Sequence, residues 1–250
     1  MSAPAGPADP AGLAPGDPAP SGLLVIDKPI RRTSMDVCRI VRARLRAGGA
    51  PRRIKVGHGG TLDPLATGVL VVLVGRATKL CDQVMARAKR YRAEIDLSAF
   101  TPSDDAETER QEVHVLRPPS PAQAQAALGQ FIGDVQQTPP VHSAIWVEGR
   151  RSYSLARAGE ARPLAPRAVR IDAIDVIDYR FPRLTLDIRC GKGVYVRSLA
   201  RDIGRALGTG GTLAALQRTG VGRWTIDQAV TLDQLPDPLS APDLLPAEVQ

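Results

Sequence analysis

Asp63 is the residue with the clearest potential for chemistry, and it lies in the glycine-rich segment from Gly57 to Gly68. Four glycines among these twelve residues allow a tight backbone path and close approach of a ligand. Pro64 follows Asp63 and pushes its backbone towards extended conformations. The segment is no P-loop, because it lacks the Lys-Ser/Thr pair. By spacing alone, Asp63 either presents a carboxylate to a ligand or caps a turn, and the turn is the commoner case.

The elements that would position Asp63 alternate irregularly between strands and helices. Apolar runs and period-two alternation predict strands, while apolar residues at helical spacing, preceded by capping residues, predict helices. This mixture predicts an α+β fold with a mixed, largely antiparallel central sheet flanked by helices and loops. The predicted strands are 22–27, 69–74, 90–97, 169–179 and 184–190, and the predicted helices run from Ser34, from Ser120-Pro121 to about Phe131, and from after Gly193 to Leu207.

The overall composition predicts a globular protein, and its basic charge fits a polyanionic partner but is also common among Arg-rich soluble proteins. The chain has 250 residues and a formal net charge of +7, and a basic surface attracts nucleic acid. Its three cysteines and three histidines form no metal-ligand pattern, so we expect no metal and a reducing, cytoplasmic location. No apolar run is long enough to span a membrane, and no secretory signal is present.

Arginines follow one face of the helix that begins at Ser34. Arg39, Arg42, Arg44 and Arg46 lie opposite its apolar positions. They form either a solvated helix face or a stripe that follows phosphates, and the sequence does not favour one over the other.

The segment VGHGGTLDPLATGVL closely resembles the central motif of the bacterial tRNA pseudouridine-55 synthases, the B-type pseudouridine synthase family. Further motifs resemble this family in the same order, from about Gly22 to Leu235, which makes the set highly specific. They are Asp27-Lys28-Pro29 with Thr33-Ser34, Lys89-Arg90-Tyr91, the acidic loop Asp104–Glu107, Gln137–Pro140 with Ser143-Ala144, Lys192–Arg197 and Leu216–Arg218.

The resemblance implies a role for each matching residue. Asp63 corresponds to the catalytic nucleophile, Tyr91 to the tyrosine that stacks on the target uracil, and Arg197 to the arginine that pairs with the catalytic carboxylate. The other positions line the nucleotide pocket (His58, Tyr195 and Leu216) or support the active-site loop (Lys28 and Pro29). By residue type alone, Tyr91 and Leu216 could be core residues, Arg197 could bind phosphate and His58 could cap the loop.

The implied reaction isomerises uridine-55 in the T loop of transfer RNA to pseudouridine. It breaks a C–N bond and forms a C–C bond between the same base and sugar, so it requires no cofactor. A carboxylate can act as nucleophile, and a nearby guanidinium keeps it ionised. The target base must be flipped out of the RNA loop. The alternatives are an RNA-binding or RNA-folding module without essential catalysis, and a synthase that acts on another RNA uridine.

The predicted domain organisation is a catalytic domain from 22 to 235 between two tails. Residues 1–21 are rich in Ala, Pro and Gly and are predicted to be disordered. Residues 134–161 resemble an RNA-gripping insertion. Residues 236–250 are predicted to be a tail with no separate RNA-binding domain, so RNA affinity must come mainly from the catalytic body. We expect the protein to be a monomer that binds transfer RNA.

Three residues depart from the family pattern. Arg31 stands where the family has glycine, so the turn there could differ or its charge could contact RNA. Gly59 replaces a common threonine, which we expect to be tolerated. Trp146 replaces a lysine, which removes a cation but adds a ring that can stack on a base.

Overall fold

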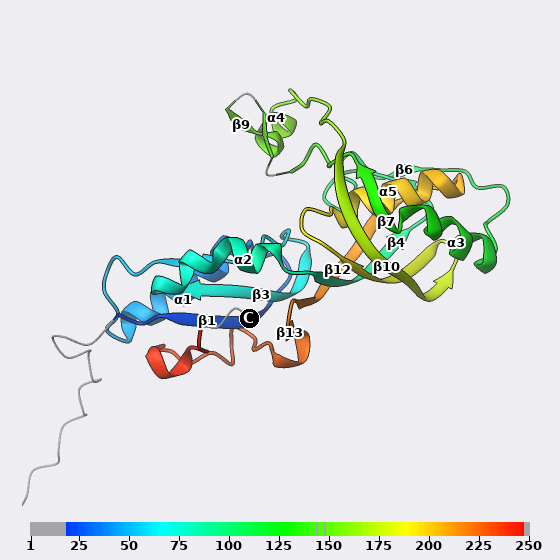
Figure 1. Ribbon diagram of the computed structural model, residues 1–250. Helices are drawn as coiled ribbons and strands as arrows, with labels where there is room; N and C mark the ends of the chain where they lie inside the picture. Colours follow the sequence, from blue (N-terminus) through cyan, green and yellow to red (C-terminus); the bar gives the residue numbers. More distant parts are fainter. Residues whose placement is uncertain (1–18, 144, 148, 248–250) are drawn as a thin grey trace, which may run out of the picture. The chain divides into compact units, whose positions relative to one another are not determined.

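The computed structural model describes residues 19–143, 145–147 and 149–247, which form two compact units (Figure 1). Most of the predicted N-terminal tail, residues 1–18, lies outside the described residues. Unit 1 comprises residues up to 64, 68–85 and from 226 onwards, and unit 2 comprises residues 65–67 and 86–225. Within the described residues, no helix is long and apolar enough to cross a membrane.

Unit 1 is built on antiparallel strands. β1 (Gly22–Lys28) pairs along its length with β3 (Ala66–Val74), and β2 (Val56–His58) also pairs with β3. The helical elements are α1 (Ser34–Ala47), α2 (Cys81–Ala86) and the 3₁₀ turns η1 (Gly75–Leu80), η3 (Ile226–Gln228) and η4 (Ala241–Asp243). The predicted strands 22–27 and 69–74 and the predicted helix from Ser34 are therefore confirmed.

The helix α1 begins at Ser34, as the sequence predicts, and Thr33 is its N-cap. The Thr33 hydroxyl accepts from Asp36 N at 3.0 Å, and the Asp36 carboxylate accepts from Thr33 N at 3.0 Å. This reciprocal capping box satisfies two donors at the helix start. It leaves the Ser34 hydroxyl available for another contact.

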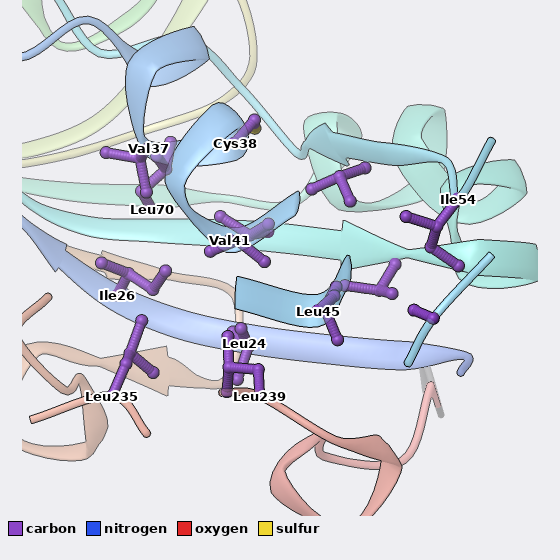
Figure 2. Close-up of a cluster of buried hydrophobic side chains, with 14 residues drawn as sticks. Leu24, Ile26, Val37, Cys38, Val41, Leu45, Ile54, Leu70, Leu235 and Leu239 are labelled. Atoms are coloured by element: carbon purple, nitrogen blue, oxygen red, sulfur yellow. The ribbon is translucent and has the colours of Figure 1, made fainter. Parts of the chain in front are cut away.

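The core of unit 1 lies between α1 and the strands. Figure 2 shows Val37, Val41 and Leu45 of α1 among the strand residues Leu24, Ile26 and Leu70, and all six are almost fully buried. Leu235 and Leu239 complete the same cluster. The segment after Leu235, predicted to be a tail, is thus packed against unit 1.

The C-terminal segment also covers the outer edge of β1. Asp27 N donates to Val230 O at 2.9 Å, Val230 N donates to Val25 O at 3.0 Å, and Leu23 exchanges two backbone hydrogen bonds with Leu245. An open strand edge would otherwise expose unpaired backbone groups.

Unit 2 is an antiparallel sheet in the order β12-β4-β11-β10-β7. These strands are β4 (Lys89–Asp96), β7 (Gly133–Gln137), β10 (Arg167–Arg180), β11 (Arg183–Cys190) and β12 (Thr212–Val221), with β13 (Trp224–Thr225) paired to β12. The alternation predicted from 90 to 97 is confirmed, because Tyr91, Ala93 and Ile95 are buried.

Helices α3 (Pro121–Leu128), which continues as η2 (Gly129–Phe131), and α5 (Val196–Leu207) contact one another and the sheet. As predicted, α3 starts at Ser120-Pro121 and α5 ends at Gly208, which adopts the left-handed conformation with φ 67°. Outside the main sheet are β5 (Ala99–Phe100), β6 (Gln111–Glu112), β8 (Trp146–Val147), β9 (Arg150–Arg151) and α4 (Ser152–Arg157). The last three fall in the predicted insertion, which Figure 1 shows as an arm beyond the sheet of unit 2.

Strand β12 lies where the sequence predicts no strand. Its ten residues include Gln217, Arg218 and Gly220, and its pairing with β4 shifts register twice. A bulged strand interrupts the period-two pattern on which the prediction depends.

Candidate active site

The loop that carries Asp63 connects β2 to β3 and is held at the residues on both sides of the carboxylate. The Ser34 hydroxyl donates to Leu62 O at 3.1 Å and accepts from Leu62 N at 2.8 Å. On the other side, Pro64 O accepts from Arg31 N at 2.7 Å. Asp63 itself is half-buried. The fixed backbone on either side restricts the positions that its carboxylate can reach.

Lys28 anchors the same loop from inside unit 1. Its side chain has no exposed surface, and Nζ donates to the carbonyl oxygens of Pro29 at 2.9 Å, Arg32 at 2.7 Å and Pro64 at 3.5 Å. An ammonium carries three donors, and a buried one is stable only when hydrogen-bonded. Lys28 therefore joins the turn after β1 to the residue that follows Asp63, while Pro29 is exposed and contributes its carbonyl.

The turn after β1 keeps a glycine-like conformation although Arg31 stands where the family has glycine. Arg31 has φ 65°, in the left-handed region that non-glycine residues rarely adopt. Its N–H makes the hydrogen bond to Pro64 described above. The hydrogen bond to Pro64 O supports Arg31 in this left-handed conformation, and a difference of this turn from that of the family stays a prediction.

The remaining loop residues pack against α2 and β1. His58 ends β2, and its carbonyl accepts from Cys81 Sγ at 3.3 Å. A Cβ added at Gly59 would lie only 2.2 Å from Val84 Cγ1, so Val84 fills the space of the missing side chain. Gly68, with φ 101°, donates its N–H to the Asp27 carboxylate at 3.1 Å.

In unit 2, Tyr91 and Leu216 lie on adjacent strands. Tyr91 of β4 is 9% exposed and lies opposite Ile188 of β11 on one side and Arg218 of β12 on the other. Leu216 lies opposite Ala93, is half-buried, and accepts at its carbonyl from Thr67 Oγ1 at 3.5 Å.

Arg197 is held by the acidic loop between β5 and β6. It is 5% exposed, its guanidinium lies 3.4 Å from Asp105 Oδ2, and it donates to Ser103 O at 3.2 Å and His142 O at 3.0 Å. Asp105 is fixed in turn by the Ser103 hydroxyl at 2.6 Å. A buried guanidinium with these partners has a restricted orientation.

One turn further along α5, Arg201 forms a second buried pair with the same loop. Its guanidinium lies 2.7 Å from the Asp104 carboxylate. Burial raises the pKa of Asp104, although Arg201 opposes that shift. The two pairs, Arg197 with Asp105 and Arg201 with Asp104, attach the acidic loop to α5 at adjacent helical turns.

Lys89, the first residue of the strand β4 that also carries Tyr91, is a buried cation. Burial, with Arg218 as the next cause, lowers the pKa of Lys89 to about 8. Its ammonium donates to Arg87 O at 2.6 Å.

Tyr195, the N-cap residue of α5, is positioned by two side chains that the sequence analysis did not single out. Gln137 accepts from Tyr195 N at 2.7 Å and donates to Tyr195 O at 3.1 Å. The guanidinium of Arg167 lies 4.9 Å from the centre of the Tyr195 ring and also donates to Gly193 O at 2.6 Å. The amide clamp fixes the backbone, and the cation–π contact orients the ring.

The predicted site residues are divided between the units. Lys28, Pro29, His58 and Asp63 belong to unit 1, whereas Tyr91, Tyr195, Arg197 and Leu216 belong to unit 2. The pairing of Arg197 with Asp63 stays a prediction. The sequence contained a signal for Asp104 and Asp105, an acidic pair that complements arginines four residues apart on α5. Gln137 begins one of the motifs that resemble the family, but nothing in the sequence indicated its contact with Tyr195.

The fold and the motif-bearing loop belong to the class of pseudouridylate synthases. Residues 48–196 match the model of the TruB family pseudouridylate synthase N-terminal domain, and residues 197–243 match the model of the tRNA pseudouridylate synthase B C-terminal domain. The chain belongs to the TruB family, which confirms the resemblance of its motifs. The second match spans residues of both units and extends into the segment predicted to be a tail.

Curated relatives agree along most of the chain. The chain is 41% identical over 215 residues to the tRNA pseudouridine synthase B of Parabacteroides distasonis. The matched region covers 86% of this chain and 92% of that protein. The chain is 47% identical over 221 residues to the protein of the same name from Mycobacterium avium, covering 87% of this chain and 70% of that protein.

The fold is similar to that of solved structures in larger assemblies. One is a Cbf5-Nop10-Gar1 complex, with a TM-score of 0.64 and 27% identity over 86% of this chain. Another is an H/ACA RNP bound to a substrate RNA containing 2'-deoxyuridine, with a TM-score of 0.62 and 25% identity. This chain spans about half of each matched chain, 53% and 52%.

Proposed function

We propose that this chain converts uridine-55 in the T loop of transfer RNA to pseudouridine, with Asp63 as its catalytic carboxylate. The observation that carries this proposal is the match to tRNA pseudouridine synthase B over 92% of a relative's length. The anchored loop around Asp63 supports it, because fixed neighbours on both sides suit a carboxylate that must meet one atom of a flipped nucleotide.

The reaction needs positioning and charge more than any external reagent. The bond between ribose C1′ and uracil N1 breaks, C1′ bonds to C5, C5 loses its proton and N1 gains one. Asp63 acts as the nucleophile, Arg197 pairs with it, and Tyr91 holds the uracil by its π-face while the base turns. His58, Tyr195 and Leu216 line the nucleotide pocket, and Lys28 and Pro29 support the Asp63 loop. No step requires a cofactor.

We further propose that the protein acts as a monomer and meets its transfer RNA in the cytoplasm. The RNA-gripping role of the arm within residues 134–161 belongs to the same proposal. Its exposed Trp146, with 60% of its surface accessible, is suited to stacking on a base.

The substitution Asp63→Asn tests the proposed catalyst, because an amide keeps the shape of the side chain but removes its charge and nucleophilicity. Purified protein is incubated with a transfer RNA transcript, and pseudouridine at position 55 is mapped chemically. We expect modification by the wild type, a rate at least about 10³-fold lower for Asp63→Asn, and nearly unchanged RNA affinity.

Asp82→Asn is the matched control, because Asp82 is an exposed aspartate in the same unit. It is expected to leave the rate unchanged. Wild-type activity in Asp63→Asn would disprove the assigned catalyst. RNA binding without modification by the wild type would instead favour the RNA-binding or RNA-folding alternative, and modification at another uridine would correct the substrate.

A further inference from the structure

A groove of about 470 Å³ in unit 1 is lined by basic side chains outside the Asp63 loop. Its cationic residues are Arg42 and Arg46 on α1 and Arg53 and Lys55 in the segment leading to β2. Ile54, Val56, Gly57 and Thr78 form the rest of the lining, so no carboxylate faces it.

The cations of the groove lack counter-charges of their own. Among the described residues, none of the four forms an ion pair with an Asp or Glu. Arg42 and Arg46 are moreover four residues apart on a helix, where like charges repel one another. By contrast, Arg39 on the same helix pairs with Asp36 at 2.6 Å, and Arg44 lies 3.5 Å from Asp237.

The backbone that carries these side chains is firmly held. Ile54 and Val56 are buried in the core cluster, so the exposed Arg53 and Lys55 alternate with them and face away from it. Figure 2 shows Ile54 in this core beside the strands. Lys55 O accepts from Gly75 N at 2.8 Å, and Arg42 donates to Val56 O at 2.8 Å. The Arg42 side chain and the backbone that carries Arg53 and Lys55 are therefore fixed before any ligand binds.

We propose that this groove binds successive backbone phosphates of the RNA substrate, as a contact separate from the Asp63 loop. Its three guanidinium groups and one ammonium can donate to the oxygens of more than one phosphodiester, and an open groove can admit a continuous strand. The inference rests on the proposed function for the choice of RNA as the polyanion. It also divides the arginines of α1 into two kinds. Within the described residues, Arg42 and Arg46 line the groove and donate only to backbone carbonyls, those of Val56 and Arg52. Arg39 and Arg44 instead have the carboxylates of Asp36 and Asp237 as partners.

The test compares two substitutions that change the net charge equally. Arg53→Gln removes a cation of the groove, whereas Arg39→Gln removes an exposed cation of α1 outside it. Affinity for unmodified transfer RNA transcript is measured by fluorescence anisotropy across a series of KCl concentrations. Each phosphate contact contributes about one unit to the slope of log affinity against log salt.

We expect Arg53→Gln to reduce that slope by about one and Arg53→Gln/Lys55→Gln by about two, with affinity about tenfold lower for the double variant near 0.1 M salt. Arg39→Gln should keep the wild-type slope. At saturating RNA, the turnover of both groove variants should stay within about twofold of the wild type, because their side chains lie outside the reacting loop.

Equal losses in Arg53→Gln and Arg39→Gln would overturn the inference, because they would show an effect of net charge alone. Unchanged slopes in the groove variants would also overturn it. Stabilisation of the wild type by millimolar pyrophosphate, together with unchanged RNA slopes, would assign the groove to a free anion instead. Inactivity of the wild type would refute the proposed function, yet the binding series would still test the groove.

Discussion

At the scale of single residues, the loop around Asp63 is shaped by local contacts at Arg31 and Gly59. Arg31 adopts a left-handed conformation, and its N–H donates to Pro64 O. Gly59 loses a side chain common in the family, and Val84 occupies the space. The sequence analysis expected Gly59 to be tolerated, and the structure shows the neighbour that accommodates it.

Restoring threonine at position 59 should therefore destabilise the protein. Its Cβ would meet Val84 Cβ and Cγ1, which cannot move away by simple rotation, so we expect Gly59→Thr to lower the free energy of unfolding by about 1–3 kcal/mol. Denaturant unfolding measures the change.

The second variant, Gly59→Thr/Val84→Ala, provides the internal check. Removing the two methyl groups of Val84 eliminates the closest contact, 2.2 Å to Cγ1, and leaves only the 2.7 Å contact to Cβ, so the double variant should be more stable than the sum of the single changes predicts. Strictly additive losses would show that Gly59 and Val84 are not coupled.

At the scale of elements, the start of α5 is positioned by the end of β7. The Gln137 side chain makes hydrogen bonds with both the N–H and the carbonyl of Tyr195. Arg197, two residues further on, contacts Asp105 of the acidic loop. One amide side chain therefore sets the entry angle of a helix that bears two of the predicted site residues.

Gln137→Ala should impair catalysis more than RNA binding. It leaves the N–H of Tyr195 without its partner, which costs about 1–3 kcal/mol, while Tyr195 O keeps the hydrogen bond from Leu199 N, and we expect kcat to fall at least about tenfold. Single-turnover kinetics with transfer RNA measure this.

The exposed neighbour Gln136 supplies the matched control, because Gln136→Ala removes the same side chain from the same strand. It should retain wild-type kcat. Equal kinetics for the two variants would show that the clamp on Tyr195 does not matter for the reaction.

At the scale of the whole molecule, the two ends of the described chain meet in unit 1. The C-terminal segment pairs with the edge of β1 and closes the core beneath α1. Arg44 reinforces this closure by donating to Leu232 O at 2.7 Å and Leu235 O at 2.8 Å. The residues after Leu235 thus contribute to the stability of the unit that carries Asp63.

Leu239→Ala should cost about 2–5 kcal/mol of unfolding free energy, because Leu239 is fully buried and truncation leaves a cavity. Thermal or denaturant unfolding measures it. Leu245→Ala is the comparison, since Leu245 is 48% exposed and its backbone pairing survives the change, and a loss below about 1 kcal/mol is expected. Similar small losses at both positions would mean that the segment packs loosely.

The sequence by itself determined the α+β class, most strands and helices, the Asp63 loop and the family, because hydrophobic periodicity, capping residues and ordered motifs are local properties of the chain. Only the tertiary structure decided which distant groups meet: Lys28 with Pro64 O, Arg197 with Asp105, Gln137 with Tyr195, and the α1 arginines with Arg53 and Lys55. It also decided the bulged strand β12, whose irregular pattern becomes a strand only when it pairs with β4. Such contacts depend on how separate elements pack, which no local pattern specifies.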